Sequence, residues 1–103
     1  MGLDYELQDE GGESLEKAVG DPQRILDGLL QLAASERLPL LSGVDFYGDT
    51  IFNRQQMPRL IEEWTQLKGW AASKDQRDLI ERLLALCRRC ESDVHTYFKI
   101  IGD

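Results

Sequence analysis

The sequence contains few of the residues that build metal sites and disulfide frameworks. It has two cysteines and one histidine in 103 residues, which is fewer soft ligands than the four of a structural zinc site. The two thiols, Cys87 and Cys90, stand one helical turn apart on an apolar stripe. That spacing favours buried free thiols over a disulfide or a metal site. We therefore expect no metal and no cofactor.

Long apolar runs are absent as well. The longest, ILDGLLQL and LPLL, are far shorter than the roughly 20 residues that span a bilayer. The N-terminus has no basic segment ahead of an apolar stretch, so nothing there resembles a secretory signal. These absences predict a cytoplasmic protein without membrane contact. The length fits a single domain over residues 1–103.

Basic residues are scarce in the first half of the chain. The net charge is −7; residues 1–53 hold eleven acids and three bases, whereas residues 54–103 hold eight acids and nine bases. A field of this sign repels nucleic acid and anionic lipid and attracts basic proteins. Solubility alone accounts for many acidic compositions. The charge indicates a basic protein partner only if the acids gather on one surface.

Hydrophobic spacing in the first part of the chain predicts a short strand and a helix. Residues 3–8 alternate apolar and polar side chains, the pattern of a strand with one buried face. The SLEKAV segment that follows fits either a helical turn or irregular structure. Asp21 followed by Pro22 predicts the start of a helix that runs to about Ala34.

Two further helices are predicted in the second half. Asn53 with Gln56, and Ser73 with Gln76, have the spacing of capping boxes ahead of amphipathic stretches. The third helix, over about residues 74–98, is the longest element, and it is either continuous or interrupted near Ser92. The tail YFKIIGD closes the chain either as helix or as a short strand.

These elements predict a mainly α fold. Three helices form the core, and a short N-terminal strand pairs with residues 44–52. Those residues belong to the segment VDFYGDTIFN and form a small turn or hairpin, because Gly48 permits positive φ and aspartate bonds to nearby backbone.

Two interpretations of this segment remain open. In the first, it is a structural turn whose aromatic side chains enter the core and whose aspartates accept backbone N–H groups. In the second, it presents acids and aromatics to a basic partner, since aromatic residues beside charges are typical of interface hot spots. Trp70 joins the second set because it lies outside the apolar stripe of its helix. The candidate partner-binding residues are Asp45, Phe46, Tyr47, Asp49 and Trp70.

Motifs of catalysis are missing. No carboxylate pair is singled out by its surroundings for acid–base work, and no glycine-rich phosphate loop is present. We therefore expect a protein that is not an enzyme. Two alternatives stay open: a small metal-dependent hydrolase that gathers Asp45, Asp49 and His95 around an ion, and a homodimeric structural or regulatory subunit that pairs through its third helix.

The stretch LPLLSGVDFYGDTIFNRQQMPRLIEEWTQL and the ending HTYFKIIGD resemble a family of small uncharacterised bacterial proteins with a YGDTxFN-type motif. The resemblance covers about a third of the chain and carries over no functional residue. Small acidic bacterial proteins of this kind include immunity proteins for toxins. The resemblance thus implies a non-catalytic acidic binding protein, an immunity protein that inhibits a basic, nuclease-type toxin.

Overall fold

A computed structural model of the chain describes residues 3–17 and 25–102. Within these residues, four strands and three α-helices follow one another in the order β1, β2, α1, β3, α2, α3, β4, with two 3-10 turns, η1 (Leu41–Gly43) and η2 (Arg54–Gln56). The helices are α1 (Ile25–Ser35), α2 (Met57–Trp70) and α3 (Lys74–Ser92). The strands are β1 (Asp4–Asp9), β2 (Ser14–Lys17), β3 (Asp49–Phe52) and β4 (Thr96–Ile101).

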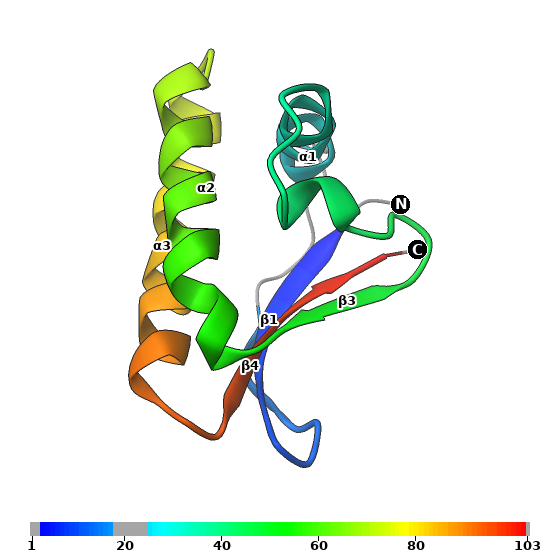
Figure 1. Cartoon of the computed structure of the whole chain (residues 1–103), viewed down its shortest axis with the longest axis vertical. Helices are drawn as coiled ribbons and strands as arrows, with labels where there is room; N and C mark the ends of the chain where they lie inside the picture. The colour runs from blue at the N-terminus through cyan, green and yellow to red at the C-terminus, as the bar shows by residue number, and fades with distance from the viewer. Residues whose placement is uncertain (1–2, 18–24, 103) are drawn as a thin grey trace.

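The strands form one antiparallel sheet in the order β2-β1-β4-β3. The two central strands, β1 and β4, come from opposite ends of the chain, and β2 and β3 form the edges. All three helices lie on one side of the sheet, and none covers the other side (Figure 1). Since side chains alternate along a strand, each strand sends every second residue toward the helices.

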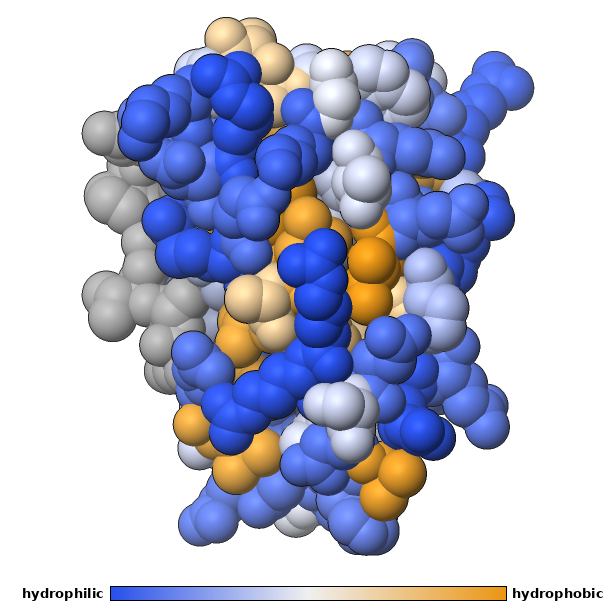
Figure 2. All heavy atoms as spheres, turned by 90° about the vertical axis from the view of Figure 1, so that its left-hand side faces the viewer, coloured by the Kyte–Doolittle hydropathy of each residue, from blue (hydrophilic) through white to orange (hydrophobic). Residues whose placement is uncertain are grey.

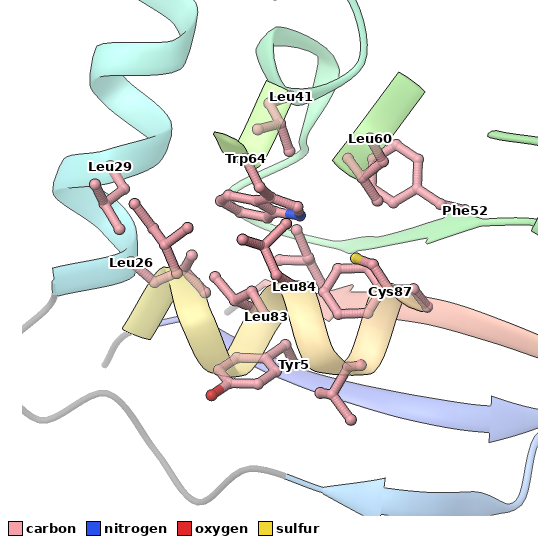
Figure 3. Packing of buried hydrophobic residues seen from close by; sticks show 14 of the residues in the cluster. Tyr5, Leu26, Leu29, Leu41, Phe52, Leu60, Trp64, Leu83, Leu84 and Cys87 are labelled. Atoms are coloured by element: carbon pink, nitrogen blue, oxygen red, sulfur yellow. The ribbon is translucent and has the colours of Figure 1, made fainter. Parts of the chain in front are cut away.

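The core lies between the sheet and the helices. Tyr5 and Leu7 of β1 face Phe98 and Ile100 of β4 on the inner side, and all four are buried. The ring of Trp64 lies between α1, the η1 turn and α3 (Figure 3), and it is fully buried. Its indole N–H has no hydrogen-bond partner of ordinary geometry.

One buried carboxylate joins α2 to the segment before β3. Glu63 is 1% exposed, and its oxygens accept the backbone N–H groups of Leu40 at 3.0 and 3.1 Å and of Leu41 at 2.9 Å. Arg59, one turn earlier on α2, lies 3.3 Å from the same carboxylate. The charge is therefore buried with partners on every side, the condition under which an interior carboxylate is tolerated.

The prediction of a mainly α fold was wrong, because the protein has an α+β fold with a four-stranded sheet. The third helix stops at Ser92, where the sequence allowed an interruption, and does not continue to residue 98. Of the two structures open to the tail, the strand is the one formed: Thr96–Ile101 is β4, the central partner of β1. The N-terminal strand pairs with β2 and β4 instead of residues 44–52. Those residues form no hairpin of their own: a turn leads into β3, which pairs with β4.

The third helix ends at Ser92 for a local reason. Asp93 Oδ1 accepts the His95 N–H at 3.1 Å, and Thr96 Oγ1 donates to the Asp93 carbonyl at 2.9 Å. These bonds satisfy the backbone in a turn and compete with continuation of the helix. The strand that follows directs Phe98 into the core and Tyr97 out of it.

The helix starts in the second half were predicted correctly. Asn53 and Gln56 form a complete capping box, with bonds in both directions. Ser73 accepts the Gln76 N–H at the start of α3. The predicted start at Asp21 lies outside the described residues, and α1 is seen from Ile25 onward. Among the residues described, each helix is too short or too polar to cross a lipid bilayer.

Candidate functional site

The loop before β3 is held together by its own polar side chains. Asp45 Oδ1 accepts the Tyr47 N–H at 2.8 Å, and the Asp45 N–H donates to Thr50 Oγ1 at 2.9 Å. The Gly48 carbonyl accepts the Gly102 N–H at 2.7 Å, which joins the loop to the end of β4. Asp45 is thus a turn residue, in agreement with the structural interpretation of this segment.

The other candidates of this segment have different surroundings. Phe46 is partly buried and packs against the core. Tyr47 is 87% exposed, so its ring contributes almost nothing to the core. Asp49 is exposed at the start of β3, with Oδ2 3.3 Å from Lys99 Nζ. Asp45, Tyr47 and Asp49 are therefore all exposed, and of the two aspartates Asp45 uses its carboxylate to hold the turn.

Trp70 lies apart from the other candidates. It is the last residue of α2 and is 45% exposed. The turn between α2 and α3 stands at one end of the molecule, away from the loop that precedes β3 (Figure 1). Trp70 and Tyr47 therefore do not form one surface.

The residues of the hydrolase alternative are not brought together. Asp49 pairs with Ile101 at one end of β4, whereas His95 precedes the other end of that strand. A strand of this length separates its ends by about 17 Å. Within residues 3–17 and 25–102, no group of three or more His, Cys, Asp or Glu side chains could hold a metal ion. The proposed gathering of Asp45, Asp49 and His95 around an ion is thus absent.

The two cysteines are buried free thiols, as the sequence predicted. The pKa of the Cys87 thiol is raised to about 12. Burial is the largest cause and the neighbouring Cys90 adds to it, whereas Trp64 and Arg88 lower the pKa. Burial is also the largest cause of the raised pKa of Cys90. Both sulfurs therefore stay protonated at neutral pH and are poor nucleophiles.

The helix-dimer alternative depended on a wide apolar face of α3. The large apolar residues of that helix pack inside the molecule, and of its apolar residues only the small Ala85 is exposed. The buried ones are Leu79, Ile80, Leu83, Leu84, Leu86, Cys87 and Cys90. Figure 2 shows the side of the molecule that carries α2 and α3, where hydrophilic side chains dominate and apolar surface is divided between the centre and smaller patches at the lower left and lower right. Such a surface does not favour a large helix–helix interface.

The outer face of the sheet has none of the three helices over it (Figure 1). Lys99 of β4 stands at its middle, with Nζ 3.8 Å from Glu6 Oε1 on β1 and 3.3 Å from Asp49 Oδ2 on β3. Ile51 is the cross-strand neighbour of Lys99 and is 51% exposed. This face therefore combines acids with accessible apolar surface.

Charge differs between the sheet and the pair of helices α2 and α3. Residues 4–17, 49–52 and 96–101, which form the sheet and its first hairpin, hold seven acids and two bases, a net charge of −5. Residues 54–92, which form η2, α2 and α3, hold six acids and eight bases, a net charge of +2. Seven of the eleven acids of residues 1–53 thus lie in the sheet and its first hairpin.

Besides Glu6 and Asp49, which lie near Lys99, two more of these acids are partly neutralised by contacts with the second half of the chain. Glu10 Oε1 lies 2.8 Å from His95 Nδ1, and Glu16 Oε2 lies 2.7 Å from Arg89 Nη1. Both pairs are exposed, so each contributes little to stability and leaves much of the field in place. The pKa of His95 is raised, chiefly by its hydrogen bond to Glu10 and then by the charges of Glu10 and Asp93.

Sequence reasoning missed most of the outer face. Gln8, Ile51, Tyr97 and Lys99 were not singled out, although the polar positions of residues 3–8 already marked one side of β1. The available signal was the alternation in TYFKII, whose Thr96, Phe98 and Ile100 face inward. Because the tail YFKIIGD was left open between helix and strand, the sequence did not give the register that places Tyr97 beside Gln8.

The comparisons with known proteins add no relative. No protein-family model, no curated protein and no solved structure matches the chain.

Proposed function

We propose that this chain is a non-catalytic binding protein that captures a basic protein on the outer face of its sheet. The observation that carries the proposal is the division of charge, with a net −5 on the sheet layer and a net +2 on residues 54–92. The field is directional as a result, and a basic partner is attracted toward one face.

The chemistry of that face supports the proposal. Steering by charge speeds encounter, but a lasting complex also needs apolar contacts that exclude water. Ile51 on β3 and Tyr47 just before it are 51% and 87% exposed and lie among acids. Lys99 holds Glu6 and Asp49 in place, so the face is ordered before a partner arrives, which lowers the entropic cost of association.

The specific form that we propose is inhibition of a basic, nuclease-type toxin by an immunity protein. A nuclease binds phosphate through arginine and lysine side chains, and carboxylates can occupy the same side chains. An acidic sheet face of this kind would compete with nucleic acid for the toxin surface. Trp70, at the far end of α2, lies outside the proposed contact surface.

Two variants with equal net charge test the location of binding. The sheet-face variant carries Asp4→Asn, Asp9→Asn, Glu13→Gln and Asp49→Asn. The helix-side variant carries Glu36→Gln, Glu62→Gln, Asp75→Asn and Glu91→Gln. The probe is a peptide of alternating arginine and glycine, and calorimetry measures its affinity at about 50 mM and about 300 mM salt.

The proposal predicts that the sheet-face variant loses about tenfold or more in affinity for the peptide at low salt, whereas the helix-side variant stays close to the natural chain. Equal losses in the two variants would mean that only net charge matters, and would contradict a binding face. The toxin form is tested separately by co-expression with the basic domain of a neighbouring gene product, where restored growth requires the natural sheet face.

A further inference from the structure

A shallow hollow of about 360 Å³ opens on the outer face of the sheet. It is lined by residues 8–12, at the turn of the β1–β2 hairpin, together with Ile51 and Tyr97. The register explains the arrangement, because Gln8 and Tyr97 are direct cross-strand neighbours. The volume is at the low end of the range typical of small-ligand sites.

The side-chain amide of Gln8 is a nearly buried polar group without a hydrogen-bond partner among the described residues. The residue is only 8% exposed, yet within the described part of the chain no hydrogen bond reaches its side-chain amide. Among the described residues, Trp64 Nε1 is the one completely buried side-chain polar atom without a hydrogen-bond partner. The amide atoms of Gln8 are therefore not completely buried. They therefore open into the hollow that Gln8 lines, where a buried polar group needs an external partner.

The turn that carries Asp9 and Glu10 is held in shape by its own hydrogen bonds. Asp9 Oδ1 accepts the N–H groups of Gly11 and Glu13, each at 2.9 Å. Gly12, with φ of +85°, completes the turn in a conformation that favours glycine. The second oxygen, Asp9 Oδ2, has no hydrogen bond within the described residues and stays available as an acceptor.

The lining defines the chemistry of a ligand. Asp9 and Glu10 are acids, and the residues that line the hollow include no lysine, arginine or histidine. Tyr97 provides an aromatic ring and Ile51 an apolar surface, both beside these carboxylates. Planar cations stack on aromatic rings, and a guanidinium group offers five donors to oxygens in its plane. An aliphatic stem would lie along Ile51.

We propose that this hollow binds the guanidinium group of an arginine side chain, held by the Asp9 carboxylate and the Gln8 amide oxygen and stacked on Tyr97. The inference rests on the proposed function for the source of that arginine, which is the basic partner. The binding site itself is independent of the partner's identity, because a free arginine derivative carries the same group.

The test is a titration of the full chain with N-acetyl-arginine amide, followed by amide chemical shifts. Saturable shifts are expected at residues 8–12, 51 and 97. N-acetyl-citrulline amide has the same shape without the charge and is expected to produce no saturable shift. Shifts that are absent, that spread evenly over the surface, or that are equal for the two compounds would overturn the site.

Three single variants separate the site from general attraction. Asp9→Asn keeps the Oδ1 acceptor of the turn and is expected to weaken binding by about fivefold, as for a partly exposed charge pair. Glu13→Gln removes the same charge from the same hairpin outside the hollow and is expected to have a smaller effect. Equal weakening by both would refute the specific site.

Gln8→Leu tests whether Gln8 binds the ligand or only supports the fold. Replacing an unpartnered buried amide by an apolar group is expected to leave the midpoint of urea denaturation unchanged or raised. The same variant is expected to weaken arginine binding. Unchanged binding would remove Gln8 from the site.

The arginine site and the proposed function can fail separately. If the arginine derivative does not bind while the sheet-face variant still loses affinity for the arginine–glycine peptide, the hollow is not the anchor and the basic partner uses another part of the face. If the sheet-face variant also behaves like the helix-side variant, the proposed function fails with it.

Discussion

The backbone N–H of Gly102 donates to the carbonyl of Gly48 at 2.7 Å. A Cβ atom at position 102 would stand 2.4 Å from that oxygen and 2.6 Å from the Gly48 nitrogen. The two glycines belong to the YGDT segment and the IIGD ending, which lie far apart in the sequence. Their contact positions the loop before β3 against the end of β4.

The first prediction concerns this glycine contact. Gly102→Ala is expected to lower the free energy of unfolding by about 1–3 kcal/mol, because the methyl group overlaps backbone atoms that cannot rotate away. Gly28→Ala is the matched control: nothing lies within 4 Å of a Cβ there, and alanine in a helix is favoured over glycine by about 0.5–1 kcal/mol. Urea denaturation measures both, and a Gly102→Ala protein as stable as the natural chain would refute the close contact.

The second prediction concerns the buried carboxylate of Glu63. Glu63→Gln turns an amide NH₂ toward N–H donors of Leu40, Leu41 or Arg59, so one or more of these bonds is lost. The expected loss of stability is about 1–3 kcal/mol. The exposed neighbour Glu62 is the control, since Glu62→Gln is expected to change stability by less than about 0.5 kcal/mol. Similar effects of the two substitutions would show that the carboxylate bonds do not support the fold.

The third prediction concerns thiol reactivity. With the pKa of Cys87 at about 12 and that of Cys90 also raised, neither thiol is expected to react with a disulfide reagent in the native protein at pH 8. Both are expected to react at once in urea. Rapid reaction of one thiol in the folded state would contradict its burial.

The fourth prediction concerns His95, whose pKa is raised from 6.5 by Glu10 first and by Asp93 to a lesser extent. Proton NMR of the imidazole should give a midpoint above 6.5 in the natural chain and a lower one in Glu10→Gln. A raised folded-state pKa means that the pair stabilises the fold fully below pH 6.5. That contribution is lost as the pH rises through the folded-state value. An identical midpoint in the two proteins would show that the contact is absent in solution.

Local signals predicted the parts of the fold that depend on neighbours in sequence. The capping box at Asn53 was found as predicted, with bonds in both directions. At Ser73 only half of the predicted box forms: the serine side chain accepts the Gln76 N–H, whereas Gln76 Oε1 accepts the Ala72 N–H in place of the Ser73 N–H. The inward positions of β1 followed from strict alternation. Such features depend on backbone chemistry within one turn or one strand.

The parts that failed depend on partners elsewhere in the chain. The apolar residues of β4 suit a helix or a strand in isolation, and pairing with β1 decides between them. β2 is four residues long at the edge of the sheet, too short to leave a periodic signal. The layer that collects the acids could not be foreseen without the sheet, since Glu10 meets His95 across 85 positions.

The most direct test of the central claim is a map of where a cation binds. Amide chemical shifts of the chain are followed during titration with the arginine–glycine peptide at low salt. The proposed function predicts that the shifts gather on β1, β3, β4 and the β1–β2 hairpin and diminish as salt is added. Shifts that gather instead on the exposed sides of α2 and α3 would contradict it.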